Sequence, residues 1–201
     1  MTSARVGRPR EFDLEEALEC AMRMFWEHGY DGLSLADLAR GMGISKPSLY
    51  AAFGDKRELF KRALRRYEAG PASYVELALT RNTAYEVVDT LLHGAARATT
   101  SPDSPHGCLT VQGAIVSSDS DTSASDLLAC WRAGLTARLT DRFTQAQAVG
   151  DLDAAASVGR LARYVSTVAS GIAVEAATGV GRTELDEVAD VTMRAWSAIA
   201  G

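Results

Sequence analysis

At 201 residues, with 47% apolar and 23% charged side chains, the chain can bury the core of one or two domains. Three cysteines, Cys20, Cys108 and Cys130, are an odd number at no metal-like spacing. They argue against a disulfide scaffold and predict a reducing, cytoplasmic location. The best charge-free apolar run, residues 164–174, is too short for a membrane span of roughly 20 residues. Charged residues interrupt the first apolar segment, residues 14–26, so we expect no secretory signal.

The formal net charge of −5 is unevenly distributed along the chain. Residues 1–67 carry 12 Lys and Arg against 10 Asp and Glu, giving +2, whereas residues 68–201 carry 9 against 16, giving −7. A polyanion such as DNA is therefore attracted to the N-terminal part only.

Residues 1–12 are predicted to form a flexible basic arm that includes Arg8 and Arg10. Two interpretations remain open for it. The arm is either a solvated terminus or a segment that settles against phosphates or into the minor groove of DNA.

Residues 13–67 are predicted to be a helical DNA-binding domain. Asp13 caps a first helix that ends near Gly29. Ser34, with Asp37 three residues on, caps a second helix, which stops between Gly41 and Gly43. Two short helices around a tight glycine turn are typical of a helix-turn-helix motif.

The second helix of this motif is the candidate DNA reader. Ser45 caps it, and Pro47 falls in the first turn, where its missing N–H has no helical partner. Leu49 and Phe53 face inward. The outward side chains are hydrogen-bonding groups of the kind that meet phosphates and base edges: Lys46, Ser48 and Tyr50.

An ordered set of residues runs through this region: Phe25, Gly29-Tyr30, Ser34, Leu38-Ala39, the stretch from Gly43 to Tyr50, Phe53, and the stretch from Lys56 to Phe60. In order and spacing, the set resembles the N-terminal domain of the TetR/AcrR family of transcriptional repressors. The resemblance implies DNA contacts, mostly to phosphates, by Ser34, Ser45, Lys46, Ser48, Tyr50 and Lys56, and Lys46-Pro47 is a common version of the motif. It does not imply which bases are read, since base-reading positions vary between members.

Residues 68–201 are predicted to be a helical ligand-binding and dimerisation domain, which makes the chain all-α. Apolar periodicity predicts helices over residues 83–99, 126–148 and 151–178, a short helix from Cys108, and a last helix opened by Thr183 and Asp186. Residues 117–125 are expected to be a polar loop or a frayed helix end.

The last two predicted helices are rich in small residues, which let helices approach closely. The resemblance implies that such a pair forms a four-helix bundle across a two-fold axis. An intrachain hairpin is the alternative. The candidate interface residues are the apolar stripe of each helix: Leu161, Val165, Ile172, Val188, Thr192 and Trp196.

The same domain is the candidate site for a small molecule. Ligand sites are mostly apolar with a few placed polar groups, although each candidate residue could equally belong to the core. The candidates are Leu92, Cys108, Gln112, Trp131, Leu135, Phe143, Tyr164 and Val168. An arginine of the helix over residues 126–148 that pointed inward would indicate an anionic ligand.

The sequence contains no pattern of an enzyme active site: no nucleophile elbow, no metalloprotease motif and no dinucleotide fingerprint. We expect no cofactor and no resident metal. His106-Gly107-Cys108 allows three interpretations: a reactive thiol at a helix N-terminus, a metal ligand pair completed by His93 or Cys130, or a buried structural cysteine.

The combined prediction is a homodimeric repressor that binds a palindromic operator and releases it when a small molecule enters the C-terminal domain. By analogy with the family, the start of the Cys108 helix would press on Leu64 and Tyr67 and move the DNA-binding domain. Two alternatives remain: a thiol-based sensor that uses Cys108, and a small-molecule-binding or catalytic helical protein with a disused helix-turn-helix.

Overall fold

The computed structural model describes residues 12–116 and 122–200, and the side chains of residues 113–116 and 122–125 fall outside the description. All elements of the described residues are helices, as the sequence predicted. The first four are α1 (Leu14–His28), α2 (Leu35–Gly41), α3 (Lys46–Phe53) and α4 (Lys56–Ala69). They are followed by α5 (Tyr74–Leu79), α6 (Ala84–Thr99), α7 (Leu109–Val116), α8 (Thr122–Ala148), α9 (Val158–Ala177) and α10 (Arg182–Ile199).

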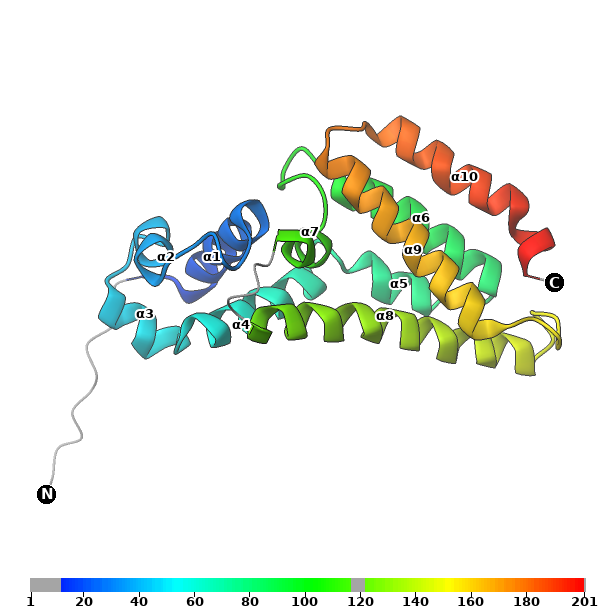
Figure 1. The fold of residues 1–201 in the computed structure, drawn as a ribbon, viewed down its shortest axis with the longest axis horizontal. Coiled ribbons are helices and arrows are strands. Elements are labelled where there is room, and N and C mark those ends of the chain that lie inside the picture. The colour runs from blue at the N-terminus through cyan, green and yellow to red at the C-terminus, as the bar shows by residue number, and fades with distance from the viewer. Residues whose placement is uncertain (1–11, 117–121, 201) are drawn as a thin grey trace, which may run out of the picture.

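Helices α1 to α4 form one end of an elongated molecule, and α10 with the C-terminus lies at the other end (Figure 1). Rings from α1 and α4 make the centre of this N-terminal part. Phe25 and Phe60 meet edge to face with centroids 4.9 Å apart, and Tyr30 packs 5.1 Å from Phe60. Such aromatic pairs add stability beyond the apolar area that they bury.

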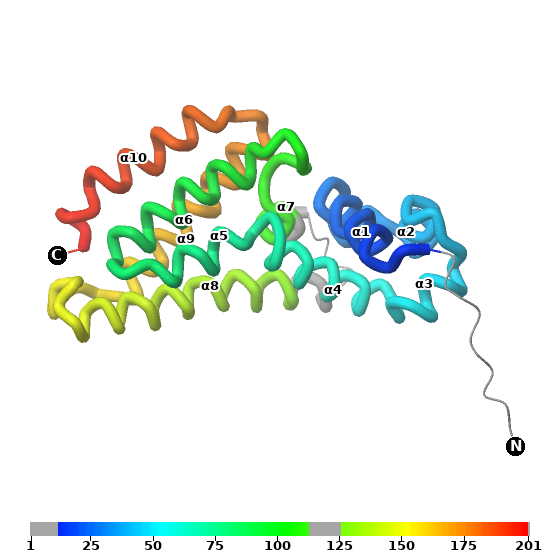
Figure 2. Tube along the Cα trace, turned by 180° about the vertical axis from the view of Figure 1, so that it is seen from behind, coloured from blue at the N-terminus to red at the C-terminus, as the bar shows by residue number. Residues whose placement is uncertain are grey.

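The C-terminal part is a layered bundle. Helix α8 runs along one side, α9 and α6 cover it, and α10 lies outermost, as both views show (Figures 1 and 2). Phe143 of α8 and Trp196 of α10 meet in its core with ring centroids 5.9 Å apart. No helix within the described residues is both long and apolar enough to cross a membrane.

The apolar cluster around α1 to α4 does not stop at the end of α4. It continues into Cys108 and Leu109 at the start of α7, Leu128 of α8 and Ala173 of α9, all of which are buried. The N-terminal part is therefore packed directly against the C-terminal part. The boundary that we expect between residues 67 and 68 stays a prediction.

Several helix bounds differ from those expected. Helix α5 lies in a segment whose periodicity gave no signal, and α10 is capped from Gly181, whose N–H donates to Glu184 Oε2 at 2.9 Å. Helix α9 begins at Val158 instead of residue 151. The preceding loop is held by hydrogen bonds from the Gln147 amide to the carbonyls of residues 153, 154 and 156, an arrangement that apolar periodicity cannot reveal.

Candidate DNA-binding surface and effector cavity

The turn between α2 and α3 is built from local hydrogen bonds. Ser34 caps α2 by accepting the Asp37 N–H at 3.1 Å, while the Asp37 carboxylate accepts the Ser34 N–H at 3.0 Å. Gly43 then adopts a left-handed backbone with φ of 66°, and the Ile44 N–H returns to the Ala39 carbonyl at 3.0 Å. These bonds fix the direction in which α3 leaves the turn.

Helix α3 presents a polar surface over two buried anchors. Leu49 and Phe53 are buried, so the opposite side of the helix faces solvent. The Ser45 hydroxyl accepts the Ser48 N–H at 3.2 Å, and the two hydroxyl oxygens lie 2.9 Å apart. The side chains expected to meet DNA on this helix are exposed except for half-buried Ser48: Ser45, Lys46, Pro47 and Tyr50, the last 53% exposed.

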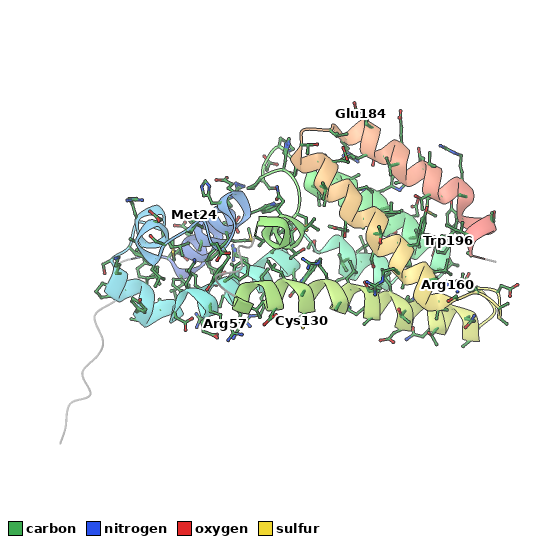
Figure 3. The ribbon with its side chains drawn as sticks, viewed as in Figure 1. Met24, Arg57, Cys130, Arg160, Glu184 and Trp196 are labelled. Carbon is green, nitrogen blue, oxygen red and sulfur yellow. The ribbon has the colours of Figure 1, made fainter. Side chains whose placement is uncertain are left out.

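Lys56 lies at the start of α4. Its Nζ is 4.0 Å from the centroid of the Tyr30 ring, a cation–π contact that ties α4 to the turn after α1. The helix dipole disfavours a cation at this position, and the electron-rich ring face compensates in part. Arg57, which was not among the predicted DNA contacts, is exposed next to Lys56 and points outward from α4 (Figure 3). Arg8 and Arg10 lie outside the described residues.

A cavity of about 370 Å³ lies between α7, α8 and α9, and we call it the effector cavity. Its volume falls within the range of about 300–1,000 Å³ that small-molecule sites occupy. The residues that line it are Tyr74, Cys108, Val111, Ala129, Trp131, Arg132, Ala133, Leu135, Thr136, Arg163, Ser166, Thr167, Ala169, Ser170 and Ala173.

Three of the eight residues expected to contact a ligand line this cavity: Cys108, Trp131 and Leu135. The other five lie elsewhere. Leu92 and Phe143 are buried in the C-terminal core, Val168 packs against that core, and Tyr164 is 42% exposed. Gln112 is half-buried near Gly107, and its Oε1 is buried without a hydrogen-bond partner among the described residues. Tyr74, Arg163 and the hydroxyl groups of α9 also line the cavity, although no sequence pattern marked them as ligand contacts.

Cys108 connects the cavity to the N-terminal part. Its Sγ accepts a hydrogen bond from the Tyr67 hydroxyl at 3.2 Å and lies 3.0 Å from Thr110 Oγ1. Burial raises the pKa of Tyr67 well above its usual value, so this hydroxyl keeps its proton. The Tyr67 ring in turn meets the Trp26 ring edge to face at 4.9 Å. A continuous path of contacts therefore runs from the cavity through α4 to α1.

The side chains proposed to complete a metal pair with Cys108 lie apart from it. His93 contacts Asp89 and Asp190, with its Nε2 3.3 Å from the Asp190 carboxylate. Cys130 is exposed on the outer side of α8 (Figure 3). The part of the chain that the structure describes contains no group of three or more potential ligands that could hold a metal ion.

Comparison with known proteins decides which family this architecture represents. The family model described as "Bacterial regulatory proteins, tetR family" matches residues 17–63. The HTH-type transcriptional repressor ComR of Escherichia coli strain K12 is 31% identical over 192 residues, which cover 94% of this chain and 91% of the repressor. The chain belongs to the TetR family. It is a DNA-binding transcriptional regulator.

A solved structure and a second sequence relative agree with this assignment. A cysteine mutant of the TetR-family regulator CifR, complexed with 26-bp double-strand operator DNA, is 38% identical, with a TM-score of 0.88 over 94% of this chain and all of that one. The HTH-type transcriptional repressor BdcR of E. coli strain K12 is 30% identical over 181 residues, which cover 86% of this chain and 83% of the repressor. The similarity to TetR-family proteins thus extends over both the helix-turn-helix and the helical C-terminal part.

The six residues expected at the dimer interface of this TetR-family chain fall into two groups, buried and exposed. Leu161, Val165, Ile172, Thr192 and Trp196 are buried in the chain's own core, so they have no surface to offer a second copy. Val188 is exposed. The apolar stripes on which this prediction rested mark the contacts of α9 and α10 with α6 and α8. The large apolar side chains that remain exposed on these two helices are Tyr164, Val188, Val191 and Ile199.

Proposed function

We propose that this regulator is a homodimeric repressor that binds a palindromic operator through α2 and α3, and that a small molecule in the effector cavity releases it. The observation that carries the proposal is the hydrogen bond from Tyr67 to Cys108. It joins a residue of the cavity wall to the helix that carries the DNA-binding elements. The proposal implies a cytoplasmic location, where the operator is accessible.

The exposed polar surface of α3 supports the DNA-binding part of the proposal. Lys46, Tyr50 and the hydroxyls of Ser45 and Ser48 lie on one short helix, with Ser34 and Lys56 at the starts of the neighbouring helices. Such donors fix a protein on the phosphate backbone. In a two-fold dimer, two copies of α3 would enter successive major grooves about 34–36 Å apart.

The path of contacts from the effector cavity through Cys108 to Tyr67 supports the proposal that a ligand releases the DNA. A ligand shifts an equilibrium only if its affinity differs between the two states. In the cavity wall, Cys108 directly precedes α7 and Val111 lies in its first turn, and α7 packs on α1, α4, α8 and α9. Occupancy that displaces the start of α7 therefore acts on Tyr67 and α4. This changes the separation of the two DNA-binding domains.

The first experiment recovers the operator. Purified protein selects sites from a random DNA pool, and fluorescence anisotropy then measures affinity for the recovered site and for random DNA at several salt concentrations. We expect an inverted repeat and an affinity that falls steeply with salt, because phosphate contacts release counterions. Equal affinity for selected and random DNA would instead favour a helical protein with a disused helix-turn-helix.

The Tyr50→Ala variant tests the α3 surface. Tyr50 is exposed, so its truncation should leave the fold intact and weaken binding to selected and random DNA alike. Tyr85→Ala is the matched control, because Tyr85 is exposed to a similar degree on α6, away from α3. Unchanged affinity of Tyr50→Ala would remove Tyr50 from the DNA-binding surface.

The Tyr67→Phe variant tests the contact path. It removes the hydroxyl that donates to Cys108 and keeps the ring that packs on Trp26. We expect a modest loss of stability, about 0.5–1.5 kcal/mol, because one buried hydrogen bond disappears. The ligand concentration required for half release of DNA should change as well. If release is the same as in the wild type, the coupling runs through other contacts.

A thiol-based sensor is the second candidate, and one observation favours it: the Cys108 Sγ lines the effector cavity between two hydroxyl groups. A reagent that enters the cavity can therefore reach this thiol. DNA release by an oxidant or electrophile should be lost in Cys108→Ser and kept in Cys130→Ser, since Cys130 is exposed on α8 outside the cavity. Full release in Cys108→Ser would exclude this candidate.

A further inference from the structure

The effector cavity has an unusual charge for its position. Among the described residues of its lining, Arg132 and Arg163 are the charged ones, and none is acidic. Residues 68–201 as a whole contain 16 acidic residues against 9 arginines. A positively charged cavity in an otherwise acidic part of the chain favours the binding of an anionic ligand.

Both arginines keep donor groups available. Arg132 Nη1 donates to the Thr110 carbonyl at 3.2 Å, which uses one of the five N–H groups of a guanidinium. Neither Arg132 nor Arg163 forms an ion pair with a carboxylate of the described residues. Arg138, six residues after Arg132 on α8, differs in this respect, because its Nη2 lies 2.7 Å from the Glu76 carboxylate.

The other residues that line the cavity indicate the chemistry of the rest of the ligand. One group is apolar: Val111, Ala129, Leu135, Ala169, Ala173 and the Trp131 ring. Another consists of hydroxyl groups on α8 and α9, where Thr136 Oγ1 donates to Ser166 Oγ at 3.1 Å. Tyr74 adds a phenol, and burial raises its pKa, so that it remains a neutral donor.

We infer that the effector cavity binds a small organic carboxylate with an apolar body, and that its carboxylate is held by Arg132 and Arg163. The inference rests on the proposed ligand-dependent release and specifies the ligand class. Arginine suits this role because its planar fork donates two parallel hydrogen bonds to a carboxylate. A cation finds no acidic partner among the described residues that line the cavity. The cavity volume of about 370 Å³ restricts the ligand to a small molecule.

This assignment also connects the ligand to DNA binding. Arg132 bonds the Thr110 carbonyl, and Thr110 Oγ1 lies 3.0 Å from Cys108 Sγ. A carboxylate that draws the Arg132 guanidinium toward itself therefore competes with the hydrogen bond to α7. The change passes to Tyr67 through Cys108.

The test measures binding to the full-length protein without DNA by calorimetry. The probes are hexanoate, benzoate and phenylacetate, each paired with its primary amide, which keeps the shape and removes the charge. We expect at least one carboxylate to bind saturably and its amide to bind at least tenfold more weakly. Arg163→Gln should weaken that carboxylate about 10- to 100-fold, the range expected for hydrogen bonds to a charged group.

Arg160→Gln is the matched control. Arg160 lies one turn before Arg163 near the start of α9 (Figure 3); both side chains are exposed, but only Arg163 lines the cavity. The Arg160→Gln variant removes the same charge from the same helix and should leave binding of the carboxylate unchanged. Arg132→Lys keeps the charge and loses the fork, so we expect intermediate affinity.

The outcomes separate this inference from the proposed release mechanism. Equal binding of acid and amide, no saturable binding of any probe at millimolar concentration, or equal effects of Arg163→Gln and Arg160→Gln would overturn the carboxylate assignment. A carboxylate that binds with the expected variant pattern but does not change affinity for the selected operator would support the site and contradict ligand-dependent release.

Discussion

Gly107 shows how strongly one residue can fix the start of α7. Its φ of 84° lies in the left-handed region that side chains disfavour. A Cβ atom there would also stand 2.8 Å from the Cβ of Ala177 and 2.8 Å from the Cδ of Gln112. Backbone conformation and lack of space therefore require glycine independently. Both constraints act directly before Cys108, which lines the effector cavity.

The Gly107→Ala variant should be destabilised by more than backbone strain alone. Gly150→Ala is the matched control, since Gly150 has a similar φ of 79° but nothing within 4 Å of the added Cβ. We expect about 1–2 kcal/mol of destabilisation at Gly150 from the left-handed backbone. Gly107 should lose a further 1–3 kcal/mol or so, because the new methyl group overlaps its neighbours. Urea unfolding measures both, and equal losses would mean that Gln112 and Ala177 move aside freely.

Among the helices, α2 depends on a capping carboxylate whose charge can be titrated. The pKa of Asp37 is lowered, first by its hydrogen bonds from the Ser34 hydroxyl and N–H, and then by Arg40. The folded state thus binds this proton less readily than the unfolded state. The stabilisation is present above the usual aspartate pKa of about 3.9 and is lost as pH falls through the lower folded value.

The Asp37→Asn variant isolates this contribution. At neutral pH it should be less stable than the wild type, because an amide neither carries the charge nor replaces both bonds from Ser34. The difference in unfolding free energy should shrink as the pH falls below about 4 and through the lower folded pKa of Asp37, where the wild-type carboxylate becomes protonated and loses its charge. Urea unfolding at a series of pH values gives the comparison. A difference that stays constant down to pH 2 would show that Asp37 acts through shape and not through charge.

The sequence predicted the elements whose signals are local. Asp13, Ser34 and Ser45 cap helices at the residues where capping patterns placed them, because a cap is made within four residues of chain. The partner of an apolar stripe is not a local property. Leu161, Val165 and Ile172 form a clear stripe, but periodicity alone does not show whether a stripe packs within its own chain or against a second copy.

The effector cavity was predicted only in part for a related reason. Trp131 and Leu135 stood out as large apolar residues, whereas Ser166, Thr167 and Ser170 had the appearance of polar positions on a helix surface. These hydroxyl groups become cavity walls only because α8 packs beside α9. Arg163 gave no signal of its own, since an isolated arginine on a helix is usually solvated.

At the scale of the whole molecule, the described part of the chain leaves apolar side chains exposed on its outermost helix. Val188, Val191 and Ile199 are exposed on α10, and Tyr164 is exposed on α9. Contiguous exposed apolar surface commonly marks an interface. These helices lie at the end of the molecule away from α3 (Figure 1), so a two-fold axis through them leaves both DNA-binding surfaces free.

The Val191→Glu variant tests this arrangement. Val191 is 58% exposed in the single chain, and a carboxylate placed there would be buried twice in a two-fold interface without a partner. We expect the dimer to dissociate in sedimentation velocity, and affinity for the palindromic operator to fall, because two half-sites are no longer bound together. Val149→Glu is the control, since Val149 is 80% exposed beyond the end of α8 and should leave the protein dimeric. If Val191→Glu remained dimeric and bound the operator normally, the interface would have to use another face, and the exposed side chains of α10 would need a different partner.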